Sequence, residues 1–349
     1  MRRELKSAIG GAAALVLAAC SGGNDHNNDD NLVFQPPGGA VRLLTVDDAA
    51  RELGNVSTGA IISSLGTTTT TATSARVATK QRGFAAALSM SGLAPRWQAR
   101  ATPSPRASSG CPGGGSDNIT ASGTTSRSFE FFNFAGTVNY EVHQYSDCSG
   151  LIAGTTIDGP AQSGATADQS YIYALQGDLP SATPLNLFFN AVDNINGQTI
   201  AERQNVLGTI EAQESSAQED LRAELLVRLI QSERGDRIYD GDFAVGDASL
   251  SFQVVSGSNS AILDGPYSYS TSLADCDGGG VTASTPQILQ LGTTSAASNV
   301  PIGGTLVLTS GTRAVTYTFN PDGSVTLSGA VNGSLSSSDV ANLWSNGAC

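Results

Sequence analysis

The segment Ala314-Val-Thr-Tyr-Thr-Phe-Asn-Pro-Asp-Gly-Ser-Val-Thr-Leu-Ser-Gly329 decides the fold class of this chain. Apolar and aromatic residues alternate with small polar ones on both sides of Asn320-Pro321-Asp322-Gly323, and a period of two is typical of a half-buried strand. Proline presets the backbone at the start of a turn and glycine accepts positive φ. The segment therefore predicts an antiparallel hairpin of residues 314–320 and 324–329.

The same alternation recurs along the chain from residue 128 onward. It predicts a second hairpin around Ala135-Gly136, with aromatic residues before the turn and apolar residues after it (Phe129, Phe131 and Phe132, then Val138, Tyr140 and Val142). Further strands are predicted at residues 151–157, 170–175, 185–192, 249–255, 267–271 and 305–309. The predicted fold is mainly β, with two antiparallel β modules, sandwich- or barrel-like, at residues 108–205 and 237–349.

One amphipathic helix is predicted between these modules, at residues 206–236, with its helical core over Thr209–Arg234. Ser216 and Glu219 have the spacing of a capping box, and leucines recur at helical spacing (Leu221, Leu225 and Leu229). We expect the apolar side of this helix to pack on a sheet of the same chain. The alternative is that it binds a helix of a partner protein. Thr45-Val46-Asp47-Asp48 resembles another capping box, opening a short helix that Gly54 ends, and residues 74–90 form a weaker helix candidate.

The N-terminus has the features of an export signal. Arg2, Arg3 and Lys6 form a basic head, and small and apolar residues follow from Ala8 to Ala19. Such a segment is too short to span a bilayer and is typical of a cleaved signal peptide.

Leu17-Ala18-Ala19-Cys20 resembles the lipobox of bacterial lipoproteins. The resemblance implies that Cys20 receives a thioether-linked diacylglycerol, that residues 1–19 are removed, and that the new amino group is acylated, typically with palmitate. Ser21 is not the aspartate that resembles an inner-membrane retention signal in enteric bacteria, so we expect the outer membrane. The alternative is an ordinary signal peptide in which Cys20 is incidental.

The next segments are poor in apolar residues. Residues 20–44 form a lipidated tether rich in Asn and Asp, which we expect to be disordered. Residues 45–107 are partly helical and of low complexity, and no acidic residue occurs between Leu53 and Ser116, where six residues are basic: Arg76, Lys80, Arg82, Arg96, Arg100 and Arg106. This basic segment would lie on anionic head groups, remain a solvated linker, or fold back on the acidic body.

Four cysteines follow Cys20, namely Cys111, Cys148, Cys276 and Cys349. An even number in an exported chain predicts disulfides, and three pairings are open. We favour Cys111 with Cys148 and Cys276 with Cys349, because each pair falls within one strand-rich block. A zinc site is the disfavoured alternative, because the chain has neither a C-x-x-C pair nor a histidine cluster.

Two cysteine-led motifs echo each other. Cys111-Pro-Gly-Gly-Gly precedes Ile119-Thr-Ala-Ser, and Cys276-Asp-Gly-Gly-Gly precedes Val281-Thr-Ala-Ser. They look like the Cys-x-Gly-Gly β-rich segments of uncharacterised exported proteins of proteobacteria, over residues 110–160 and 270–349. The resemblance implies no activity.

Few residues point to catalysis or cofactor binding. The chain has two histidines, His26 in the tether and His143 in a predicted strand, and it lacks G-x-S-x-G, H-E-x-x-H, P-loop and G-x-G-x-x-G motifs. We therefore predict no catalytic residues and no cofactor. Asp236, Asp240, Asp242 and Asp247 form the densest acidic cluster and are a weak calcium candidate, with ordinary turn aspartates as the alternative.

The charge balance bears on the partner class. Residues 20–349 carry 15 basic and 30 acidic side chains, so nucleic acid is an unlikely ligand. We expect a non-enzymatic outer-membrane lipoprotein with an envelope-structural, surface-contact or adhesion role. The alternatives are a polysaccharide-acting or ligand-binding envelope protein, although Trp97 and Trp344 lie outside the strand blocks, and an accessory subunit of a secretion or assembly system that uses the predicted helix.

Overall fold

A computed structural model describes residues 39–61, 110–149, 155–168, 170–174, 186–195, 198–215, 218–234, 236–247, 249–257, 259–273, 276, 278–292 and 300–346. All of them belong to one compact unit, Phe34–Cys349. Residues 1–38 and 62–109, which include the predicted signal peptide, most of the tether, the helix candidate at 74–90 and most of the basic segment, lie outside the described residues.

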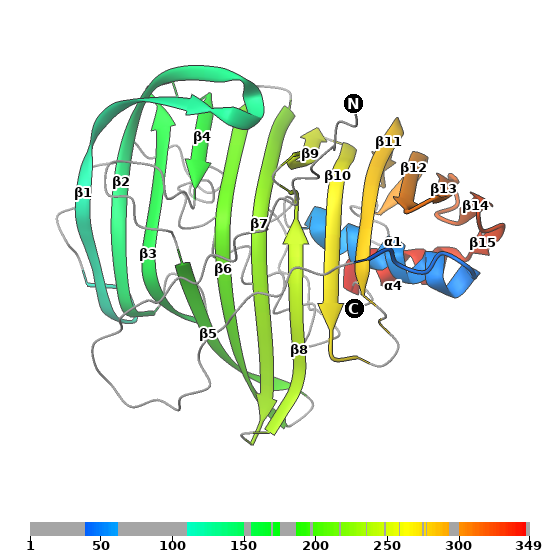
Figure 1. The fold of residues 1–349 in the computed structure, drawn as a ribbon, viewed down its shortest axis with the longest axis horizontal. Helices are drawn as coiled ribbons and strands as arrows, with labels where there is room; N and C mark the ends of the chain where they lie inside the picture. Colours follow the sequence, from blue (N-terminus) through cyan, green and yellow to red (C-terminus); the bar gives the residue numbers. More distant parts are fainter. Residues whose placement is uncertain are drawn as a thin grey trace, which may run out of the picture. The chain divides into compact units, whose positions relative to one another are not determined.

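The described strands form one antiparallel sheet (Figure 1). They are β1 Gly114–Phe129, β2 Phe134–Ser149, β3 Thr155–Thr166, β4 Tyr171–Ala174, β5 Asn186–Ile195, β6 Gln198–Glu214, β7 Gln218–Glu233, β8 Asp236–Val245, β9 Phe252–Gly257, β10 Ser260–Thr271, β11 Gly279–Leu291, β12 Pro301–Ser310, β13 Arg313–Phe319, β14 Val325–Gly329 and β15 Gly333–Leu335. The main order is β1-β2-β3-β4-β6-β7-β8-β10-β11-β12-β13-β14-β15, with β5 beside β3 and β6, and β9 beside β7 and β10.

The prediction of a mainly β, antiparallel fold is confirmed. The strand-rich blocks predicted at 108–205 and 237–349 both contribute to this sheet, and β6 and β7 join them.

The predicted helix at 206–236 is wrong, because its residues form most of β6 and all of β7. The stretch after Gln218 satisfies two periods at once. Its leucines are spaced as in a helix, but Leu221, Ala223, Leu225 and Val227 also recur with a period of two, and all four are buried in the sheet. Pairing with β6 along its whole length decides between the two periods. The hypothesis of partner binding through this helix is therefore withdrawn.

The two predicted hairpins differ in outcome. The Asn320–Gly323 turn is confirmed: Gly323 has φ +82° and β13 pairs with β14 across it. The turn predicted at Ala135-Gly136 instead lies at the 3-10 turn η1, Glu130–Phe132, and Asn133. Asn133 adopts the left-handed conformation, φ 50°, which asparagine tolerates better than most residues, so Phe129 pairs with Phe134.

Two α-helices accompany the sheet among the described residues, α1 Val46–Ile61 and α4 Ser337–Asn346. The capping box of α1 is confirmed, because the Asp48 amide donates to Thr45 Oγ1 and the Thr45 amide donates to Asp48 Oδ2. The helix continues past Gly54, and Leu53 and Val56 on either side of it are completely buried. Helix α4 was not predicted, and it contacts α1 (Figure 1).

The core extends through most of the described unit. One hydrophobic cluster links α1 and α4 to strands from β2 to β15, and a second, smaller cluster contains Phe129, Val138 and Tyr173. Within the strands, burial follows the period of two, as in β10, where Leu263, Tyr267 and Tyr269 face the core. Among the described helices, neither is long and apolar enough to cross a membrane.

Candidate functional site

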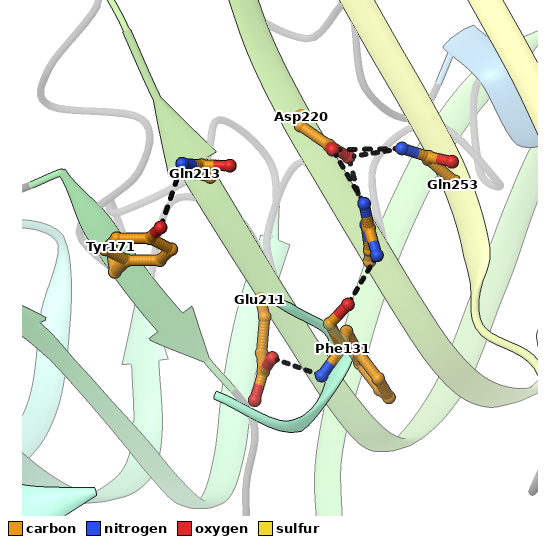
Figure 2. Close-up of polar contacts among 7 residues, drawn as sticks. Phe131, Tyr171, Glu211, Gln213, Asp220 and Gln253 are labelled. Atoms are coloured by element: carbon orange, nitrogen blue, oxygen red, sulfur yellow. Dashed lines mark hydrogen bonds and ion pairs between the residues drawn. The ribbon is translucent and has the colours of Figure 1, made fainter. Parts of the chain in front are cut away.

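The tip of the β1–β2 hairpin folds onto the polar face of β6 and β7. Glu211 of β6 accepts hydrogen bonds from the backbone N–H groups of Glu130, at 3.2 Å, and Phe131, at 3.0 Å. Arg222 of β7 donates to the carbonyl oxygen of Phe131. Figure 2 shows Phe131 on the turn of the β1–β2 hairpin, with its backbone N–H directed at Glu211. Two side chains of opposite charge therefore hold the donor and the acceptor of one peptide segment.

A buried ion pair lies beneath this tip. Arg127 Nη2 lies 3.5 Å from Glu211 Oε1, and the two side chains are 4% and 1% exposed. The guanidinium also lies 4.0 Å from the centre of the Tyr173 ring, a cation–π contact. Burial raises the pKa of Glu211, and the Phe131 N–H, the Arg127 charge and the Glu130 N–H oppose this. The carboxylate is thus compensated by a cation and two backbone donors.

Aromatic rings gather around the tip. We call the partly buried ones, Phe132, Phe134, Tyr140 and Tyr171, the tip cluster. Phe134 and Tyr171 stack with ring centres 4.0 Å apart and an interplanar angle of 10°. The Tyr171 hydroxyl accepts a hydrogen bond from Gln213 Nε2 at 2.9 Å (Figure 2). The tip cluster thus combines partly buried rings with side chains that are hydrogen-bonded in place.

The polar network continues across the sheet to β9. Arg222 pairs with Asp220 at 3.0 Å, and Gln253 Nε2 donates to both carboxylate oxygens of Asp220 (Figure 2). The Arg222 guanidinium lies 4.5 Å from the centre of the Phe132 ring. The sequence analysis missed Arg127, Glu211 and Arg222. For Glu211 and Arg222 the signal was the set of polar residues along β6 and β7, to which the helix prediction gave no role.

The predicted strand histidine, His143, lies on β2 between two acids. Its Nδ1 is 2.8 Å from Asp117 Oδ1, its Nε2 is 3.2 Å from Glu141 Oε2, and its ring stacks on that of Tyr145. Because an ionised carboxylate only accepts hydrogen bonds, both contacts are hydrogen bonds only when both ring nitrogens carry hydrogen. His143 links β1 to β2 through Asp117. The other histidine, His26, lies outside the described residues.

The four aspartates of the calcium prediction have different partners. Asp240 and Asp242 both pair with Arg228, and Asp247 caps its own turn by accepting from the amides of Ser249 and Leu250. Asp236 is exposed at the start of β8. No group of three or more potential ligands that could hold a metal ion occurs in the described part of the chain. Asp240 and Asp242 are two positions apart on β8, so both side chains lie on the same face as Arg228 of the neighbouring β7.

The cysteines confirm one predicted pairing. Cys111 and Cys148 form a disulfide with Cα atoms 5.3 Å apart, which ties the start of β1 to the end of β2. Gly115 lies at this junction, where a Cβ would come within 2.1 Å of the Asp147 carbonyl oxygen, so the glycine-rich motif is needed there. Cys276 is also disulfide-bonded. Its predicted partner Cys349 and the lipid-attachment residue Cys20 lie outside the described residues.

A second buried carboxylate, Glu52, lies in α1 and is 2% exposed. Burial raises its pKa to about 7, although hydrogen bonds from Tyr269 and Asn55 and the charge of Arg51 lower it. The sequence carried a signal for this residue, since Glu52 falls on the same helical side as Ala49, Leu53 and Val56, all of them completely buried. A charge within an apolar stripe indicates a buried acid.

Compared with known proteins, the chain matches no family model, no curated sequence and no solved structure at a significant level.

Proposed function

We propose that this chain is a lipid-anchored protein of the outer membrane, whose sheet serves a non-enzymatic role in envelope structure, surface contact or adhesion. The observation that carries the proposal is Leu17-Ala18-Ala19-Cys20 after a basic and apolar leader. The disulfide Cys111–Cys148 supports it, because such bonds form and persist in exported proteins.

The physics of the anchor favours a permanent attachment. Each buried methylene contributes about 0.8 kcal/mol, and one acyl chain alone holds only marginally. A cysteine that carries a diacylglycerol and an amide-linked chain exceeds the two signals needed for stable anchoring. The sheet would then remain at the membrane surface through the tether at residues 20–44.

Replacement of the acylated residue tests the anchor. We expect the Cys20→Ser variant to leave the membrane fraction, and we expect the wild-type N-terminal peptide to have the mass of a triacylated cysteine. Ser21→Ala is the matched control and stays in the outer membrane, whereas Ser21→Asp moves to the inner membrane of an enteric host. Unchanged fractionation of Cys20→Ser would refute the proposal.

A second candidate function, ligand binding by the envelope protein, is favoured by the tip cluster. Exposed tryptophan or tyrosine rings are the feature we expected of such a site, but Trp344 is buried in α4 and Trp97 lies outside the described residues. The tip cluster instead has partly buried phenylalanine and tyrosine rings, with Arg222 over the Phe132 ring and Gln213 hydrogen-bonded to Tyr171. Ring faces flanked by hydrogen-bonding groups suit sugars, which have apolar faces and hydroxyl edges.

Calorimetric titration with chitohexaose, maltohexaose and cellohexaose tests this second candidate. We expect one of these oligosaccharides to bind the wild type, and we expect Tyr171→Ala to abolish that binding. Tyr317→Phe, which alters a buried tyrosine of β13, is the control and retains it. No heat of binding with any of the three probes would count against a glycan site at the tip cluster.

A further inference from the structure

Helix α1 is joined to the C-terminal half of the sheet by two tyrosine hydroxyls. Tyr269 of β10 donates to Glu52 Oε1 at 2.6 Å, and Tyr317 of β13 donates to the Ala49 carbonyl oxygen at 2.8 Å. Leu53 and Val56 add a completely buried apolar surface. We call the contact of α1 with β10 and β13 the docking interface.

The docking interface contains the carboxyl group of Glu52, which forms no ion pair with a described residue of the sheet. Glu52 Oε2 is buried, and the side chains that hydrogen-bond the carboxyl group, Tyr269 and Asn55, are neutral. Moving an ionised carboxylate out of water without a compensating partner is costly, and such groups bind a proton instead. The docked helix therefore favours the protonated form of Glu52.

The neighbours of Glu52 leave it as the group that changes charge near neutral pH. Tyr267 and Tyr269 face it from β10 and Tyr317 from β13, and burial raises the pKa of each tyrosine above its usual range. Arg51 and Asp48 are its charged neighbours within α1. The tyrosines thus stay neutral over the range in which Glu52 titrates.

We propose that docking of α1 onto the sheet is coupled to the uptake of one proton by Glu52, so that the helix opens more readily as the pH rises. The proton comes from solvent and returns to it on opening. This inference is independent of the lipid anchor.

The size of the coupling follows from the two protonation states. An exposed Glu52 has a pKa near 4.5, and in the docked helix the pKa is about 7. The group thus stabilises docking fully below pH 4.5, and this contribution is lost as the pH rises through 7. The opening constant of α1 should rise about tenfold per pH unit between these values, and about 300-fold in all.

Hydrogen exchange of the full chain, purified in detergent, tests the coupling at pH 4.5, 6 and 8. Protection factors, corrected for the intrinsic exchange rate, are compared between the peptide that covers residues 46–61 and one from β12. We expect α1 protection to fall with rising pH while β12 protection stays constant. Equal protection of α1 at all three pH values would overturn the proposal.

Three variants separate the proton from the packing. Glu52→Gln should make α1 protection independent of pH, whereas Tyr317→Phe should lower protection by a similar factor at every pH and keep the slope. If Glu52→Gln does not fold, Tyr269→Phe serves instead, because losing the hydroxyl leaves the carboxylate less compensated and moves the pH-dependent range upward. A Glu52→Gln protein with the wild-type pH dependence, or a Tyr269→Phe protein whose range does not move, would refute the role of Glu52.

Discussion

The hairpin tip and the docking interface each bury a glutamate, but they compensate its charge in different ways. Glu211 meets Arg127 and two backbone N–H groups, whereas the hydrogen-bonding neighbours of Glu52, Tyr269 and Asn55, are both uncharged. The first carboxylate is held by fixed charges and dipoles, and the second by a proton. Two glutamates that are buried to the same extent therefore respond to different changes. The stability of the hairpin tip depends on the Arg127 charge, and the stability of the docking interface depends on pH.

The largest effect is expected at the tip, where Arg127→Ala would leave Glu211 buried without its cation. Breaking a buried pair from one side costs about 3 to 5 kcal/mol of unfolding free energy. Urea unfolding of wild type and variant at pH 7 measures it. The double variant Arg127→Met with Glu211→Leu removes both charges and should recover much of the loss. If the double variant is as unstable as Arg127→Ala, packing rather than charge dominates at the tip.

The hairpin that carries the tip is closed at its other end by Cys111–Cys148, two cysteines that are 37 residues apart in sequence. In the chain-entropy model, replacing both by serine lowers the unfolding free energy by about 4 kcal/mol. We expect the loss of hydrogen-exchange protection to concentrate in β1 and β2 and to spare α1. Equal losses of protection in β1–β2 and in α1 would show that the hairpin and the docking interface unfold together. The two regions would then not be independent.

The pH response should appear at the docking interface in global stability as well. Because the pKa of Glu52 is raised by burial, wild type loses stability as pH rises from 4.5 to beyond 7, and about 3 kcal/mol is at stake. Glu52→Gln should therefore gain about that amount over wild type at pH 8 relative to pH 4. Thermal unfolding at the two pH values measures the gain. A constant difference between the proteins at both pH values would contradict the raised pKa.

The smallest effect is expected where the tip meets solvent. Tyr171→Phe keeps the stack on Phe134 and removes the hydrogen bond from Gln213, a neutral contact that contributes about 1 kcal/mol or less. Urea unfolding should place this variant close to wild type, and Phe134→Ala well below it. A large loss in Tyr171→Phe would mean that the hydroxyl, rather than the rings, orders the tip cluster.

Local signals predicted the parts of the fold that local interactions determine. The Asn320–Gly323 turn and the Thr45–Asp48 capping box are each satisfied within a few residues, and both were found from the sequence. The β7 segment was not, because its leucines fit two periods and only pairing with β6 selects the strand. The same limit applies to the tip, since Arg127 and Glu211 are 84 residues apart in the chain.

The order in which the chain emerges matters for α1. The two hydroxyls that join it to the sheet belong to residues 217 and 268 positions later in sequence, whereas β1 with β2, and β6 with β7, pair between immediate neighbours. Contacts this distant form late, because a long loop must close first. During synthesis or translocation the apolar side of α1 therefore stays exposed in part until β13 and α4 have been made. A chain stalled before Arg313 would present that side of the helix to chaperones and proteases.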